Sequence, residues 1–207
     1  YIPKPVIAER TNRLLWLSTF THTFFRIGDL PKLINFEKFI YNSRVETFWF
    51  PPVLNFNTDS SPEYDFVFAG SSTSFRDKVI NKLRENEFTI LTPRSTQSMG
   101  AMVSFKKRSV DIGKARLSLN IPQELSWPWL SPMRIRGSFY ASRATLSLFT
   151  NDKSEIGKST IQIDCDEDNL NISLIRKYLK DYRQSYKDMI NEYNRSTYND
   201  SYTNNLK

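Results

Sequence analysis

Cysteine and histidine are almost absent from this 207-residue sequence, which contains one of each. The single cysteine, Cys165, excludes an internal disulfide and a zinc site built from thiolates, because both need several thiols. The single histidine, His22, excludes a metal centre with several imidazole ligands. The sequence also supports no serine–histidine–aspartate or cysteine–histidine catalytic set. The chemistry of this chain must therefore rest on other residue types.

Glycine is also scarce, since the chain has six glycines and any two are at least 13 residues apart. This spacing excludes the G-x-G-x-x-G dinucleotide fingerprint and the Walker phosphate-binding loop, which both need closely spaced glycines. Long apolar runs are missing as well. With no window of ~18 uninterrupted apolar residues, the sequence predicts no membrane-spanning helix.

The residues that are present describe a folded domain with an excess of positive charge. Apolar residues make up 39% of the chain and aromatic residues 14%, which is too apolar for a disordered chain. The length fits one large domain or two small ones. The formal net charge of +7 favours anionic partners such as nucleotides, phosphates, nucleic acid or acidic lipid, without choosing among them.

The start of the sequence indicates a piece of a longer protein, because Tyr1 stands where a methionine is expected. No basic-then-apolar signal segment opens the chain. We therefore expect a cytoplasmic location, with peripheral contact to a membrane as a further option.

The apolar pattern predicts alternating strands and helices after a polar linker at 55–63. Before the linker we expect a strand at 14–17, a helix at 30–40 and a strand at 45–50. After it, strands are expected at 64–69, 88–91, 115–121, 145–149 and 160–164, and helices at 74–86, 100–111, 132–141 and 174–190. Short connections between such elements predict an α/β fold, in which a parallel sheet has helices on both faces. Ligands of these sheets bind beyond the carboxyl ends of the strands.

The turn after the strand at 64–69 is the first candidate site. Gly70, Ser71 and Ser72 lead into a helix whose first turn carries Arg76. A glycine allows close approach of a ligand, and hydroxyl and N–H groups at a helix start can bind phosphate oxygens. A cation in the first turn opposes the helix dipole, so Arg76 is better explained if it meets an anion. The alternative is an ordinary strand-to-helix turn with a serine cap.

Other polar or aromatic segments have two interpretations each. Trp127 and Trp129 could stack on a sugar or base, or anchor a long loop on the core. The acidic run 164–168 follows a strand, where it could hold a divalent cation, but capping of the terminal helix explains it better. The basic run 106–108 is more typical of a solvated helix face than of a nucleic-acid contact. His22, among aromatic residues, is either buried and structural or catalytic.

The order of several short motifs resembles the carboxyl-terminal domain of GT-B-fold glycosyltransferases, particularly the CgeB-like group. The matching motifs cover about 64–182. They are, in order, Phe68-Ala69-Gly70-Ser71 with Arg76, then Leu119-Asn120-Ile121, then Met133-Arg134-Ile135, then an apolar strand, an acidic loop, and a closing helix that begins near Leu170.

The resemblance implies a Rossmann-like half of a GT-B fold that binds a nucleotide-diphosphate sugar. Residues 1–55 would then be the end of an amino-terminal Rossmann-like domain, 56–194 the nucleotide-sugar-binding domain and 195–207 a flexible tail. The implied binding residues are Gly70, Ser71, Ser72, Arg76, Asn120, Met133, Arg134 and Ser138, with no metal and no assigned catalytic residue.

The expected function is therefore the donor-binding part of a glycosyltransferase that transfers a sugar to a glycan, lipid or protein acceptor. No cofactor is expected besides the donor substrate. The family usually has a glutamate that holds the ribose, whereas this chain has Gly137 or Ser138 at that place. This departure favours one alternative, a non-catalytic binding module of the same fold. A nucleic-acid-binding domain, based on the net charge, is the third.

Overall fold

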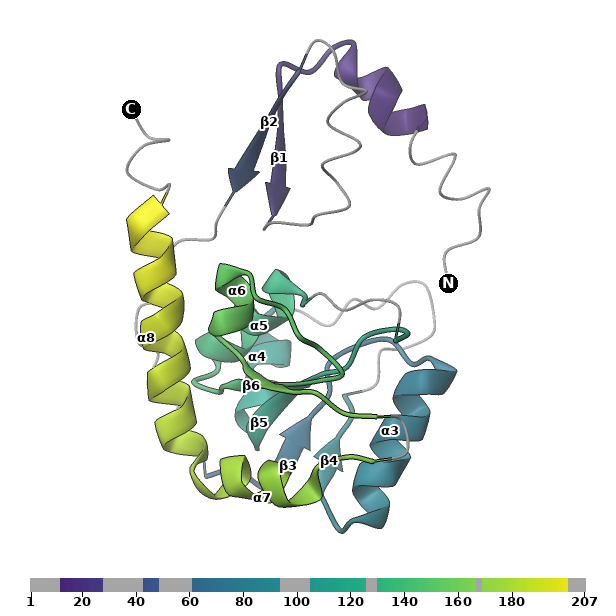
Figure 1. Ribbon diagram of the computed structural model, residues 1–207, viewed down its shortest axis with the longest axis vertical. Helices are drawn as coiled ribbons and strands as arrows, with labels where there is room; N and C mark the ends of the chain where they lie inside the picture. The colour runs from purple at the N-terminus through teal and green to yellow at the C-terminus, as the bar shows by residue number, and fades with distance from the viewer. Residues whose placement is uncertain are drawn as a thin grey trace.

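The computed structural model describes residues 12–27, 43–48, 61–93, 105–125, 130–166 and 169–200. They form two sheets, one of two strands and one of five (Figure 1). The larger sheet contains β3 (Tyr64–Val67), β4 (Ile90–Leu91), β5 (Ala115–Asn120), β6 (Thr145–Leu148) and β7 (Ile161–Ile163).

All neighbouring strands of the larger sheet are parallel, and their order is β4-β3-β5-β6-β7. This is the doubly wound order in which the first strand lies between the second and the third. The predicted α/β class is thus confirmed. The strands that the apolar pattern predicts in this part of the chain are all present, although β4 has only two residues.

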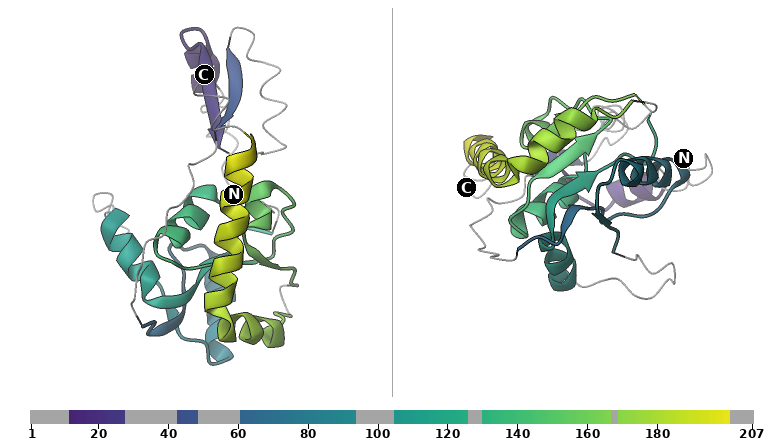
Figure 2. Two further views of the ribbon diagram at one scale, coloured as in Figure 1. Left: turned by 90° about the vertical axis from the view of Figure 1, so that its left-hand side faces the viewer. Right: turned by 90° about the horizontal axis from the view of Figure 1, so that it is seen from below.

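Helices cover both faces of this sheet (Figure 2). On one face, α3 (Ser74–Glu85) and α7 (Ile172–Lys180) bury apolar side chains against leucines of β5 and β6. The second group consists of α4 (Phe105–Gly113), α5 (Pro132–Tyr140), α6 (Glu155–Lys158) and α8 (Tyr182–Asp200). In that group Ile135 and Phe139 of α5 pack against Ile190 and Tyr193 of α8.

The two central strands have one apolar face and one polar face, and both faces are buried. Leu117, Leu119 and Leu146 belong to the apolar core, whereas Ser118 is paired in register with Thr145, and Asn120 with Ser147. Four polar atoms of this second set, the three hydroxyls and Asn120 Nδ2, are buried without a hydrogen-bond partner among the residues that the structure describes. A buried parallel strand is usually apolar on both faces, so this polar stripe is unusual.

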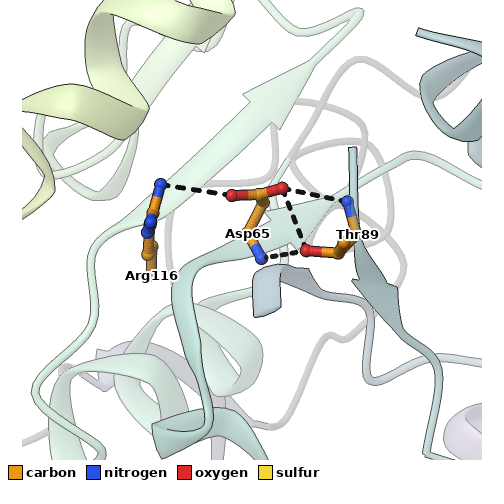
Figure 3. A network of polar contacts seen from close by, with 3 residues as sticks. All are labelled: Asp65, Thr89 and Arg116. Carbon is orange, nitrogen blue, oxygen red and sulfur yellow. Dashed lines mark hydrogen bonds and ion pairs between the residues drawn. The ribbon is translucent and has the colours of Figure 1, made fainter. Parts of the chain in front are cut away.

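A network of polar contacts around Asp65 connects the amino ends of three strands of this sheet (Figure 3). Asp65 Oδ2 accepts hydrogen bonds from the backbone N–H and the hydroxyl of Thr89, both at 2.9 Å. Asp65 Oδ1 lies 3.3 Å from Nη1 of Arg116. These contacts join β5, β3 and the segment before β4 at the edge opposite to the one where ligands of such sheets bind.

The smaller sheet pairs β1 (Thr23–Ile27) with β2 (Arg44–Phe48) in parallel. Figure 1 shows both of its arrows pointing toward the body that contains the larger sheet. β2 agrees with the predicted strand at 45–50. The predicted helix at 30–40 and most of the linker at 55–63 lie outside the described residues.

The strand predicted at 14–17 is wrong, because residues 12–18 form a helix. At the end of this helix the hydroxyls of Ser18 and Thr19 donate to the carbonyls of Leu15 and Trp16. The apolar side chains of this helix are not all covered, since Trp16 is 64% exposed. A short apolar run cannot distinguish the two states by its pattern alone.

Several helix boundaries also differ from the predicted ones. The long terminal helix is two helices, because α7 ends before Asp181, whose N–H bonds to the carbonyl of Lys177. α8 then continues to Asp200, beyond the start of the predicted tail. α6 was not predicted. Within the described ranges, no helix has the length and apolarity that crossing a membrane requires.

Candidate functional site

The strand order creates a switch point between β3 and β5. The chain leaves β3 through α3 toward β4 on one side, and leaves β5 through α5 toward β6 on the other. In open α/β sheets the crevice at such a point, beyond the carboxyl ends of the strands, is where ligands bind. The loops after Val67 and after Asn120 meet at this place.

Arg76 joins these two loops. It lies in the first turn of α3, whose N-cap is Thr73 rather than the predicted Ser74. Its Nε donates to the carbonyls of Ile121 and Pro122 at 3.0 and 3.2 Å, and its Nη1 donates to the carbonyl of Ser71 at 3.0 Å. The side chain is buried, and this burial lowers its pKa below the usual value. Arg76 therefore joins the two loops through hydrogen bonds to their backbone carbonyls. Because carbonyl groups are neutral, these bonds do not cancel the positive charge of the guanidinium.

Arg134 approaches the same place from α5, which begins with Pro132 after an extended Ser131. Its Nη1 donates to Oδ1 of Asn120 at 2.7 Å. Burial, followed by the charges of Arg76 and Arg108, lowers the pKa of Arg134 to about 10. The guanidinium is therefore still protonated at neutral pH.

Phe68 contacts both arginines, with its ring centre 5.4 Å from Cζ of Arg76 and 5.5 Å from Cζ of Arg134. Gly70 is needed beside it. A Cβ atom at Gly70 would lie 2.8 Å from Cζ of Phe68 and 3.1 Å from Nη2 of Arg134, closer than such contacts normally allow. We call the set Phe68, Gly70, Arg76, Asn120 and Arg134 the cradle.

A cavity of about 220 Å³ opens at the cradle. Its lining includes Arg76, Asn120 and Arg134, together with Gln123, Leu130 and Ser131. Pockets for drug-sized ligands measure ~300–1,000 Å³, so this one accommodates the charged part of such a ligand and not the whole of it. In the part of the chain that the structure describes, neither guanidinium of the cradle has a carboxylate partner.

The structure brings together four of the eight binding residues that the resemblance implies: Gly70, Arg76, Asn120 and Arg134. The other four lie beside the cradle or turn away from it. Ser71 accepts a hydrogen bond from Arg76, and the hydroxyl of Ser72 donates to Asp77. Met133 is 62% exposed, and the buried hydroxyl of Ser138 donates to the carbonyl of Arg134 within its own helix.

The remaining candidates lie elsewhere. His22 is exposed, so the buried interpretation is wrong, and its carbonyl accepts from the N–H of Arg44. Asp164 and Asp166 line a separate hollow at the start of α7. No group of three or more metal-ligating side chains occurs among the described residues. Trp127 and Trp129 lie outside the described residues.

Two residues contribute to this region in ways that sequence reasoning did not predict. Arg108 belongs to the basic run on α4 and is exposed, as the solvated-face interpretation predicts, yet its charge also lowers the pKa of Arg134. Phe68 was named only as part of the motif Phe68-Ala69-Gly70-Ser71, without its contacts to both arginines. Both contributions depend on which helices and strands become neighbours, which no local pattern encodes.

Comparisons with known proteins add no further information at this point. No protein-family model, no curated protein and no solved structure matches the chain. The class of the domain, a Rossmann-like α/β fold, therefore rests on its own strand order and helix layers.

Proposed function

We propose that the cradle binds the diphosphate of a nucleotide-diphosphate sugar and that the chain is the donor-binding part of a glycosyltransferase. The observation that carries this proposal is the pair of guanidinium groups at the switch point, Arg76 and Arg134, with no carboxylate partner among the described residues. A buried and a half-buried cation side by side are unfavourable unless an anion accompanies them. The ligand is therefore expected to be anionic.

Phosphate fits this site better than other anions for two reasons. Guanidinium groups match the oxygen geometry of phosphate, and Gly70 leaves room beside it for the Phe68 ring and the Arg134 guanidinium. The amino ends of α3 and α5 both lie at this edge, because each helix follows a strand of the switch point. Their partial positive charges favour a phosphate group at the same place. Arg108 on α4 adds positive charge near Arg134.

In this proposal the residues of the cradle act on the leaving group. When the bond between the sugar and the diphosphate breaks, negative charge gathers on the diphosphate. Arg134 would stabilise that charge directly, and Arg76 would keep the two loops in place before the reaction begins. The acceptor, and any group that activates it, would be contributed by other parts of the protein.

A non-catalytic binding module of the same fold is the second candidate. One observation favours it: α5 has no acidic residue, and the places of Gly137 and Ser138 are buried, with the Ser138 hydroxyl bonded to its own helix. Such a module would bind nucleoside diphosphates in the same cradle and would not turn over a donor. Hydrolysis of a nucleotide sugar by the protein would therefore contradict this candidate.

Calorimetric titration with pyrophosphate and with uridine, guanosine and cytidine diphosphates tests the proposal. Arg134→Gln is expected to weaken binding roughly 10- to 100-fold, because a hydrogen bond to a charged group contributes ~1.5–3 kcal/mol. Arg176→Gln is the matched control, since Arg176 also lies over a phenylalanine ring, 5.0 Å from the centre of Phe88, and donates to a backbone carbonyl. Folded wild-type protein that binds none of the four ligands would contradict the proposal.

A further inference from the structure

Asn120 is the uncharged polar residue of the cradle, and only one of the two polar atoms of its amide has a hydrogen-bond partner among the described residues. The side chain belongs to a residue that is 2% exposed at the end of β5. Its Oδ1 accepts from Arg134 at 2.7 Å, whereas its Nδ2 is buried and has no partner among the described residues. Because the residue also lines the cavity, an unpaired donor is buried beside the site where an anion is expected.

A neutral residue at this position has an energetic consequence. A carboxylate could accept the same hydrogen bond from Arg134, would make it stronger, and would leave no donor unpaired. It would also cancel much of the positive charge of the two arginines. Asparagine positions the guanidinium without cancelling that charge, at the cost of a buried N–H group with no partner in the empty site.

We propose that Asn120 selects an anionic ligand: its amide oxygen positions Arg134, its Nδ2 donates to an oxygen of the bound phosphate, and its lack of charge keeps the cradle positive. This inference rests on the proposed function. It assigns a role in specificity to Asn120, which the resemblance implied only as a binding residue, and it assigns a partner to the unpaired Nδ2 group.

The test compares Asn120→Asp with Asn120→Ala in the whole chain, with pyrophosphate and uridine diphosphate as probes. Asn120→Ala removes the donor without adding charge, so we expect about 3- to 10-fold weaker binding. Asn120→Asp also introduces a negative charge within a few ångströms of the ligand, so we expect binding to weaken about 100-fold or more. Without ligand, Asn120→Asp is expected to melt at or above the wild-type temperature, because its carboxylate pairs with Arg134.

Asn81→Asp is the control for the change in net charge. Asn81 also accepts a hydrogen bond from an arginine, at 3.5 Å from Nη1 of Arg84, but it lies on the exposed side of α3. Its substitution is expected to leave both affinities within twofold of the wild type. Any larger loss would show that net charge alone, and not the position of Asn120, controls binding.

The outcomes separate this inference from the proposed function. If the wild type binds neither probe, the proposed function fails and the role of Asn120 fails with it. If the wild type binds and the two Asn120 variants lose affinity equally, or not at all, the selection by charge is refuted while the proposed function stands. A marked fall in the melting temperature of Asn120→Asp would instead show that the amide is needed for the fold, which also refutes it.

Discussion

Two buried glycines, Gly137 and Gly157, should respond in opposite ways to the same substitution by alanine. Each lies inside a helix, Gly137 in α5 and Gly157 in α6, and neither is in the left-handed region of backbone space. Helix propensity alone would favour alanine at both positions by ~1 kcal/mol. The surroundings of the two positions decide whether this gain is realised.

At Gly137 a Cβ atom would have no neighbouring atom within 4 Å. Nothing then opposes the gain in propensity, so Gly137→Ala should raise the free energy of unfolding by about 0.5–1 kcal/mol. For a chain of this length that corresponds to a rise in melting temperature of roughly 1–4 °C.

At Gly157 a Cβ atom would lie 1.9 Å from the backbone oxygen of Asp152 and 2.7 Å from its carbonyl carbon. The two backbones would have to separate by about 1.5 Å or more to restore an ordinary contact. That movement would break the hydrogen bonds by which Nε2 of Gln162 joins the carbonyls of Asp152 and Gly157, at 2.7 and 2.9 Å. Gly157→Ala should therefore lower the free energy of unfolding by about 1–3 kcal/mol, which is ~2–12 °C in melting temperature.

Urea denaturation followed by tryptophan fluorescence, together with a thermal melt, measures both variants against the wild type. The two variants carry the same chemical change, so any general effect of an added methyl group cancels in the comparison. Changes of the same sign, or a stabilising Gly157→Ala, would refute the packing argument. Gly157→Ala should also weaken ligand binding, because it displaces Asp152. The Asp152 carboxylate accepts a hydrogen bond, at 3.3 Å, from the N–H of Leu130, which lines the cradle cavity.

Two further predictions concern the opposite edge of the sheet and the single thiol. Asp65→Asn should lower the free energy of unfolding by about 1–2 kcal/mol, because it weakens the contacts with Thr89 and Arg116. Urea denaturation measures this loss, with Asp188→Asn on the exposed side of α8 as the control. Equal losses in the two variants would contradict the stabilising role of the Asp65 network. Burial raises the pKa of the Cys165 thiol in the folded chain above its usual value. The neutral thiol should therefore favour the folded state below the ordinary thiol pKa, and this contribution to stability should be lost as the pH rises through the pKa of the folded chain. Thiol-specific labelling should accordingly be slower in the folded chain than in urea at pH 8.5, and equal rates would contradict the burial.

Most of the secondary structure from 61 onward follows from local patterns. The apolar positions of α3 repeat with the helical period, and Val79, Ile80 and Leu83 are buried together as that period requires. The strands β5 and β6 alternate between apolar and polar residues, which is the period of a strand. The errors occur where a local pattern has two solutions, as at 14–17, or where a single residue interrupts a continuous stripe, as at Asp181 between α7 and α8.

The candidate site shows where local reasoning is insufficient. Gly70 and Arg76 could be identified from the strand-to-helix turn alone, because the chemistry of a helix start is local. The structural role of Arg76 could not be identified in this way. Arg76 donates to carbonyls 45 and 46 residues further along the chain, so it acts as a structural link between loops before it can act on any ligand. The contact between Arg134 and Asn120 spans 14 residues and requires α5 to fold back over β5.

The sequence by itself determined that the chain builds a parallel α/β sheet, because alternating apolar periods of two and 3.6 residues with short connections leave few other arrangements. Only the tertiary structure decided that β3 and β5 are neighbours, with β4 outside them. Strand order depends on long-range packing that no local pattern encodes. That order places two arginines and one asparagine around a single cavity, where the charges of the two arginines act together.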